Sequence, residues 1–102
     1  MRIIKKATLV VYGEQNPQAR TGLAHWYKVA KATPWACFTD VRTTFPHADQ
    51  VTVRSGRKVV VFNIGGNKYR LITAIHYNRQ RLFTMMILTH AEYDRNDWKD
   101  LL

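Results

Sequence analysis

The sequence predicts an α+β domain: a small, mainly antiparallel sheet, an N-terminal helical hairpin packed on one face and a short C-terminal helix. Three observations predict this fold class. Helix-forming segments fill much of the first third of the 102 residues. Strand-like segments joined by tight turns follow them, and a helix-start motif comes after the last strand. The length suits one domain, so we expect a single domain over residues 1–102.

The N-terminal third contains a short strand and the predicted hairpin. The β-branched segment 2–4 is typical of a strand. Residues 8–12 predict a helix that ends near Gly13, because glycine readily adopts the left-handed backbone of a helix end. Asn16-Pro17 is typical of a helix start. Apolar residues then recur at helical spacing as far as Thr33-Pro34: Leu23, Trp26, Tyr27 and Ala30.

The remaining two thirds predict the sheet and the last helix. A helical turn at 40–44 and a strand at 51–53 come first. A meander of three strands follows, with turns at Gly65-Gly66 and at residues 78–80. We expect these strands at 58–64, 67–77 and 82–88. Thr89 and Glu92 then form a capping box, which starts the final helix.

The charge distribution points to a polyanion as partner. The chain carries sixteen basic and seven acidic residues, for a net charge of +9, and four of the acidic ones follow Ala91. A basic body with an acidic end favours nucleic acid or the ribosome. The alternative is that the charge serves solubility alone. One cysteine, Cys37, and no apolar stretch near the roughly 20 residues of a membrane span predict a cytoplasmic protein without membrane contact.

Two groups of side chains are candidates for phosphodiester chemistry. Lys68 and Arg70 are two residues apart on a predicted strand and therefore share a face. His90, Tyr93 and Asp94 are spaced to crowd one face of the last helix. The ordinary alternatives are solvated strand cations, a structural histidine and a core tyrosine. No histidine or carboxylate spacing predicts a metal site, and no cofactor is expected.

Four blocks of sequence are familiar as a set: His25-Trp26-Tyr27, Asp40-Val41-Arg42-Thr43-Thr44-Phe45-Pro46 with Ala48-Asp49, the stretch from Val61 to Ile72 around Gly65-Gly66-Asn67-Lys68-Tyr69-Arg70, and Leu88-Thr89-His90-Ala91-Glu92-Tyr93-Asp94. On these blocks the chain resembles the HigB family of type II toxin–antitoxin systems, within the RelE-like superfamily. Two stretches depart from the pattern. The turn at 55–57 is longer and more basic than expected, and Met85 and Met86 stand where a basic or β-branched residue is common.

The resemblance implies a RelE-like fold and a metal-independent endoribonuclease that cuts mRNA, commonly during translation. It also implies a helix-turn-helix antitoxin, bound in a hetero-oligomer. The catalytic residues are then Arg70, His90 and Tyr93, and Asn67, Lys68 and Asp94 are expected to contact RNA or assist there. A different class of function stays open, a basic module that binds RNA or the ribosome and blocks translation without cleavage.

Overall fold

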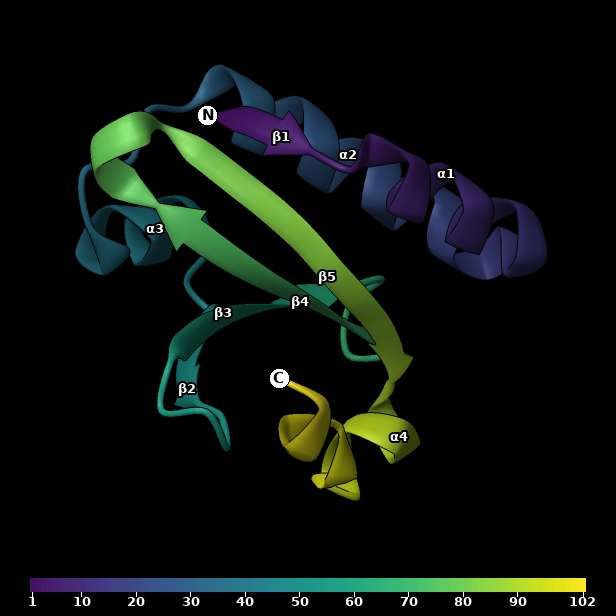
Figure 1. Ribbon diagram of the computed structural model, residues 1–102. Helices are drawn as coiled ribbons and strands as arrows, with labels where there is room; N and C mark the ends of the chain where they lie inside the picture. The colour runs from purple at the N-terminus through teal and green to yellow at the C-terminus, as the bar shows by residue number, and fades with distance from the viewer.

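A five-stranded sheet in the order β1-β5-β4-β3-β2 forms the framework of the molecule (Figure 1). The computed structural model describes residues 1–102. β1 runs parallel to β5, and every other neighbouring pair is antiparallel, which confirms the α+β class. The strands are β1 Arg2–Ile4, β2 Asp49–Thr52, β3 Lys58–Ile64, β4 Tyr69–His76 and β5 Arg81–Thr89. The helices are α1 Lys6–Gln15, α2 Pro17–Ala32, α3 Phe38–Thr44 and α4 His90–Asp94, with 3₁₀ turns η1 Tyr77–Arg79 and η2 Asp97–Leu101.

The helical hairpin of α1 and α2 packs on one face of the sheet, as predicted. α1 is longer than the segment 8–12, and Gly13 lies inside it rather than at its end. A Cβ atom at Gly13 would sit 3.7 Å from the Cα of Arg20 on α2, so this glycine serves helix–helix contact and not a left-handed cap. Asn16 precedes α2 as expected, but its amide donates to the Tyr12 carbonyl and makes no cap bond.

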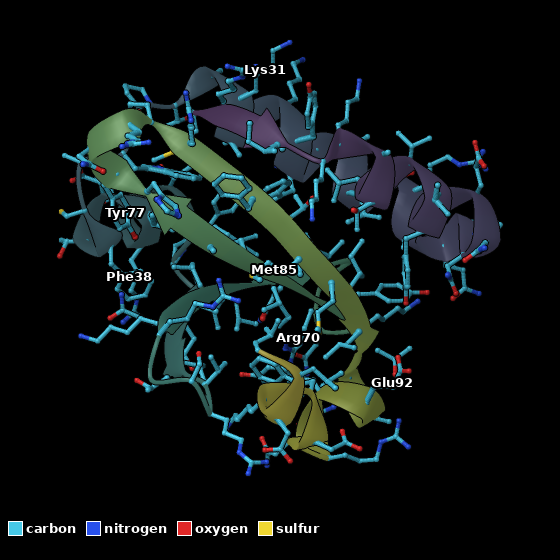
Figure 2. All side chains as sticks on the ribbon, in the orientation of Figure 1. Lys31, Phe38, Arg70, Tyr77, Met85 and Glu92 are labelled. Atoms are coloured by element: carbon cyan, nitrogen blue, oxygen red, sulfur yellow. The ribbon has the colours of Figure 1, made fainter.

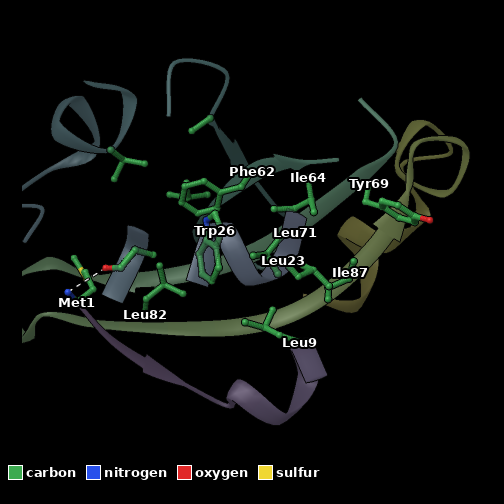
Figure 3. Packing of buried hydrophobic residues seen from close by; sticks show 14 of the residues in the cluster. Met1, Leu9, Leu23, Trp26, Phe62, Ile64, Tyr69, Leu71, Leu82 and Ile87 are labelled. Carbon is green, nitrogen blue, oxygen red and sulfur yellow. Dashed lines mark hydrogen bonds between the residues drawn. The ribbon is translucent and has the colours of Figure 1, made fainter. Parts of the chain in front are cut away.

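The larger core lies between this hairpin and the sheet (Figure 3). Trp26 on α2 meets Phe62 on β3 edge to face, with ring centroids 5.2 Å apart, and Leu71 on β4 is fully buried beside them. Gly22 brings α2 against the β3–β4 turn, because a Cβ there would lie 2.9 Å from the Gly65 nitrogen. The hairpin therefore fixes the turn that precedes β4.

The C-terminal segment, residues 90–102 with α4 and η2, covers part of the opposite face of the sheet. Trp98 on η2 is 3% exposed and packs with Val59, Val61 and Ile72 in a second, smaller core. Side chains alternate along β4, so Arg70 and Ile72 share this face, while Tyr69 and Leu71 face the hairpin. None of the helices combines the length and apolar character that a membrane crossing requires.

Strand boundaries differ from expectation at both ends of β4. The turn that contains Gly65 and Gly66 has positive φ at both glycines, 63° and 71°, and it extends through Lys68. β4 therefore begins at Tyr69, and the prediction that Lys68 is a strand residue sharing a face with Arg70 is wrong. At the other end, Tyr77 belongs to η1 rather than to the strand.

Candidate active site

Arg70 is a nearly buried cation that forms no ion pair. Only 8% of its surface is exposed. Its guanidinium donates to the carbonyl oxygens of Asn67, at 3.2 Å, and Tyr69, at 3.1 Å, and to the side-chain oxygen of Asn67. The one ion pair of the molecule joins His90 and Asp94, so Arg70 has no carboxylate in direct contact, although the carboxylates of Asp49 and Asp94 are near enough to act on the pKa of the neighbouring Tyr93. Burying an unpaired charge is costly, which marks this position as one that suits an external anion.

Tyr93 on α4 lies over this guanidinium. Its ring centroid is 5.5 Å from the Arg70 Cζ, within the range of a cation–π contact. The ring also stacks on Trp98, with centroids 5.3 Å apart and planes 22° apart, and the Trp98 Nε1–H donates to the Tyr93 carbonyl at 3.0 Å. Burial raises the pKa of the Tyr93 hydroxyl, and the carboxylates of Asp49 and Asp94 add to this while Arg70 opposes it. The phenol is therefore protonated at neutral pH and is a hydrogen-bond donor.

His90 opens α4 through the predicted capping box. The Thr89 hydroxyl accepts from the Glu92 backbone N–H at 3.2 Å, and the Glu92 carboxylate accepts from the Thr89 N–H at 2.9 Å. The His90 backbone N–H donates to the Lys68 carbonyl at 2.9 Å. This bond ties the start of α4 to the turn before β4.

The imidazole of His90 pairs with Asp94 one helical turn later. Its Nδ1 lies 2.9 Å from the Asp94 Oδ2, and the two side chains are 44% and 59% exposed. The sequence spacing predicted that His90, Tyr93 and Asp94 crowd one helix face; the structure confirms the contact of His90 with Asp94, whereas Tyr93 contacts Arg70 and Trp98. Because the carboxylate holds Nδ1, the second ring nitrogen, Nε2, is left without a hydrogen-bond partner on a side chain that is partly exposed. An imidazole oriented in this way can accept a proton at Nε2.

The candidate residues therefore fall into two connected groups and one outlier. Arg70 contacts both Asn67 and Tyr93, and His90 pairs with Asp94. The backbone bond from His90 to Lys68 attaches the second group to the turn that contains Asn67. The Lys68 side chain is exposed in the turn and makes no hydrogen bond or ion pair. Figure 2 shows Arg70 between the sheet and the C-terminal segment, and Glu92 at the outer edge of that segment.

Sequence reasoning missed two residues of this region. Asn63 on β3 is directly opposite Arg70 in the antiparallel register, so both side chains lie on the same face. Its amide is partly exposed and makes no hydrogen bond within the chain. Trp98 supports Tyr93 from a 3₁₀ turn. Strand pairing could have placed Asn63 opposite Arg70, but the pairing depends on the length of the turn. Trp98 stands out in the sequence only as an isolated apolar residue in a polar stretch.

No three histidine, cysteine, aspartate or glutamate side chains gather where they could hold one metal ion. The largest hollow of the molecule, about 490 Å³, lies between α1 and α2, with Leu9, Leu23 and Tyr27 in its lining. It is on the hairpin side of the sheet, away from Arg70. We therefore place the candidate site at Arg70, where the polar and charged groups converge, and not in the largest hollow.

The fold and the site define a small, basic α+β domain with a cationic centre at the junction of the sheet and the C-terminal segment. Residues 19–96 match the HigB toxin family, described as the RelE-like toxic component of a toxin–antitoxin system. The chain belongs to this family, as its resemblance had indicated.

Two relatives are named for what they do. The chain is 35% identical over 95 residues to the mRNA interferase HigB of Escherichia coli O6:H1 (strain CFT073), covering 93% of this chain and 90% of the relative. It is 27% identical over 94 residues to the mRNA interferase HigB of Shigella flexneri, covering 92% and 88%.

Proposed function

We propose that this chain is the toxin of a toxin–antitoxin system and acts as a metal-independent endoribonuclease on mRNA. The observation that carries the proposal is the nearly buried Arg70 without a carboxylate partner. A phosphodiester supplies the missing negative charge, and the family and the names of the relatives agree with such a substrate. Guanidinium is suited to this role because it offers several donors in one plane.

The proposed reaction is attack of a ribose 2′-oxygen on the adjacent phosphorus. His90 Nε2 takes the proton from the 2′-hydroxyl as the P–O2′ bond forms. The P–O5′ bond then breaks, and the leaving 5′-oxygen takes a proton from the Tyr93 hydroxyl or from water. The products are a 2′,3′-cyclic phosphate and a 5′-hydroxyl, so the reaction consumes no water and needs no metal.

Arg70 stabilises the charge that develops on the phosphorane. A guanidinium has five N–H donors, and three of them are used for the carbonyls of Asn67 and Tyr69 and the Asn67 side chain. Two donors remain for phosphate oxygens. Donors fixed before the reaction stabilise the transition state most, because they need no reorganisation. Asn67 then acts as the residue that holds Arg70, Asp94 as the one that orients His90, and Lys68 as a nearby phosphate contact.

The cover over Arg70 explains why cleavage would depend on translation. With only 8% of Arg70 exposed, few orientations of a free RNA bring a phosphate to its remaining donors. A ribosome that holds mRNA and toxin in place supplies the orientation that free RNA lacks. We further propose a cytoplasmic protein whose partners are mRNA, the ribosome and a helix-turn-helix antitoxin in a hetero-oligomer.

The test is to induce the gene alone in a bacterial host and map new 5′ ends on mRNA by primer extension. We expect growth arrest with new ends for the wild type and neither for Arg70→Ala, which retains its fold by circular dichroism. His90→Ala is expected to reduce cleavage by about 10²-fold or more, as for loss of a general base. Arg42→Ala, which removes an exposed arginine on α3, is the matched control and leaves cleavage intact.

The same experiment separates the alternative function. Arrest with no new 5′ ends identifies a module that blocks translation by binding, and an unaffected Arg70→Ala, His90→Ala double variant removes the site assignment. Ends that carry a 5′-phosphate instead of a 5′-hydroxyl contradict the 2′-oxygen mechanism while leaving the nuclease in place.

A further inference from the structure

A second hollow lies on the same sheet face as Arg70, next to the end of the C-terminal segment. It measures about 280 Å³, and its lining includes Ala74 and His76 of β4, Phe83 of β5, Lys5, Arg57 and Leu102. The register places Arg70, Ile72 and Ala74 on one face, so the hollow is about 13 Å from Arg70 along the strand. Figure 2 shows Met85, which also lines it, on β5 above Arg70.

The hollow combines an aromatic surface with unpaired cations. Phe83 is half-buried, and His76 meets it edge to face, with ring centroids 5.3 Å apart. Lys5 and Arg57 are exposed, and neither forms an ion pair. An aromatic face for a base beside cations for the backbone is the combination that proteins use to bind single-stranded nucleic acid.

A β-bulge places the aromatic ring on this face. Ile72 is opposite Met86 and Thr73 is opposite Thr84, so Met85 is an extra residue on β5. Without it, strict alternation would put Phe83 and Met86 on opposite faces. With it, Phe83 pairs with Ala74 and shares the face of Arg70. Bulges of this kind often re-aim a side chain beside a functional site.

Lys5 is held at the rim in an unfavourable conformation. Its φ of 67° and ψ of 45° are left-handed, which is uncommon for a residue other than glycine, asparagine or aspartate. The hydroxyl of Thr84, a buried residue, donates to the carbonyls of Ile4 and Lys5, at 3.2 and 2.8 Å, and fixes this junction to β5. Strained backbone that the surroundings hold in place often occurs at binding sites.

From these observations we infer that the hollow around Phe83 is a second RNA subsite. One base of the single strand stacks on Phe83, and Lys5 and Arg57 contact the phosphates beside it. The strand then runs along the sheet face to the phosphodiester at Arg70. The inference rests on the proposed function for its substrate class, and it adds a subsite that sets the length of RNA bound.

The test measures binding without cleavage. Purified protein is titrated into fluorescein-labelled RNA in which every ribose is 2′-O-methylated, so that no 2′-hydroxyl can attack. Anisotropy gives the Kd for a dinucleotide and for an octanucleotide of the same sequence. Wild type is expected to bind the octanucleotide at least tenfold more tightly, because only the longer RNA spans both sites.

Substitutions in the hollow should reduce octanucleotide binding alone. We expect Phe83→Leu to weaken it about tenfold or more, in the range for loss of a base–aromatic stack. Arg57→Gln should weaken it less and lower the slope of log Kd against log salt by about one. Lys5→Asn, which suits left-handed backbone, should keep or raise thermal stability and still weaken binding. Lys28→Gln, an exposed lysine on α2, is the matched control.

Hollow variants that all bind the octanucleotide within twofold of wild type overturn the inference, as does a wild type that does not distinguish the two lengths. Cleavage ends mapped in cells for the same variants keep the two proposals apart. If the hollow variants cleave mRNA and bind the octanucleotide as wild type does, the nuclease proposal stands and the subsite inference is wrong. If the hollow variants bind the octanucleotide more weakly but wild type produces no cleavage ends, the subsite inference stands as RNA binding and the nuclease proposal is wrong.

Discussion

The Tyr93 ring lies 5.5 Å from the Arg70 Cζ and is stacked on Trp98, so one aromatic side chain links the cation of β4 to the C-terminal segment. This contact shields a charge that forms no ion pair. It also places a protonated hydroxyl close to the guanidinium. Tyr93 therefore has two separable contributions, its ring as a cover and its hydroxyl as a donor.

Tyr93→Phe separates them. The phenyl ring keeps the cover, so we expect stability within about 0.5 kcal/mol of wild type, as for a substitution that removes no packing. Loss of the donor should lower cleavage about 10- to 100-fold, measured as the fraction of mRNA with new 5′ ends. Tyr27→Phe on α2 removes a hydroxyl from the other face of the molecule and should leave cleavage unchanged. Equal cleavage by Tyr93→Phe would leave the ring as the only contribution of this residue.

Asn67→Asp tests the claim that Arg70 lacks an ion-pair partner. The new carboxylate would replace an amide oxygen that already accepts from the guanidinium. We expect up to about 1 kcal/mol of added stability at pH 7, since the site is partly open to solvent. Cleavage should fall, because the carboxylate competes with the phosphodiester.

The pH dependence of Asn67→Asp gives an independent readout. Arg70 should hold the pKa of the new carboxyl below its unfolded value of about 3.9. The added stability is therefore present above about pH 4 and is lost as the pH falls through the folded value. Asn78→Asp in η1, with the same change in charge, is the control. Thermal melts at pH 7 and pH 3 that differ from wild type by the same amount would contradict the claim.

The sequence could predict those parts of the site that depend on local signals. Strand alternation put Arg70 and Ile72 on one face, and helical spacing put His90 and Asp94 on one face of the last helix; both hold. The predicted position of Lys68 on a strand was wrong, because two glycines with positive φ lengthen the turn by a residue or two beyond what composition indicates.

The parts that sequence could not predict depend on distant contacts. β1 pairs in parallel with β5, about eighty residues later in the chain. The bulge at Met85 is visible only as a register shift against β4. η2 has no helical periodicity to predict Trp98 as the cover of Ile72. Family resemblance supplied the identity of the domain, but not these contacts.

Glu92→Gln tests the capping box through its pH dependence. The hydrogen bond from the Thr89 backbone N–H lowers the pKa of the Glu92 carboxyl, and partial burial opposes this lowering without cancelling it. A lowered folded pKa means that the stabilisation is present above the unfolded value of about 4.3 and is lost as the pH falls. Wild type should therefore lose up to about 1 kcal/mol more than Glu92→Gln between about pH 5 and pH 3.

Glu14→Gln on α1 is the matched control for this change. Glu14 is exposed and makes no hydrogen bond or ion pair through its side chain. Its substitution should leave the pH profile of thermal stability parallel to that of wild type. A profile for Glu92→Gln that also runs parallel would mean that the carboxylate contributes nothing that the neutral amide does not.

Trp98→Phe tests whether the C-terminal segment holds Tyr93 in place. The change removes the indole N–H that donates to the Tyr93 carbonyl and leaves an aromatic ring in the second core. We expect a loss of roughly 1–3 kcal/mol, with faster amide hydrogen exchange at residues 93–101 and unchanged exchange in β4. Cleavage should fall as well, because the position of the Tyr93 hydroxyl is no longer fixed.

Trp35→Phe provides the comparison, because its indole N–H also donates a 3.0 Å hydrogen bond, to the Thr44 hydroxyl, from a fully buried ring. It lies in the larger core, on the hairpin side of the sheet. A similar loss of stability is expected there, with no change of exchange at residues 93–101 beyond that of global unfolding. If the two variants show the same exchange pattern, Trp98 contributes only to global stability, and the support of Tyr93 must come from the capping box of α4.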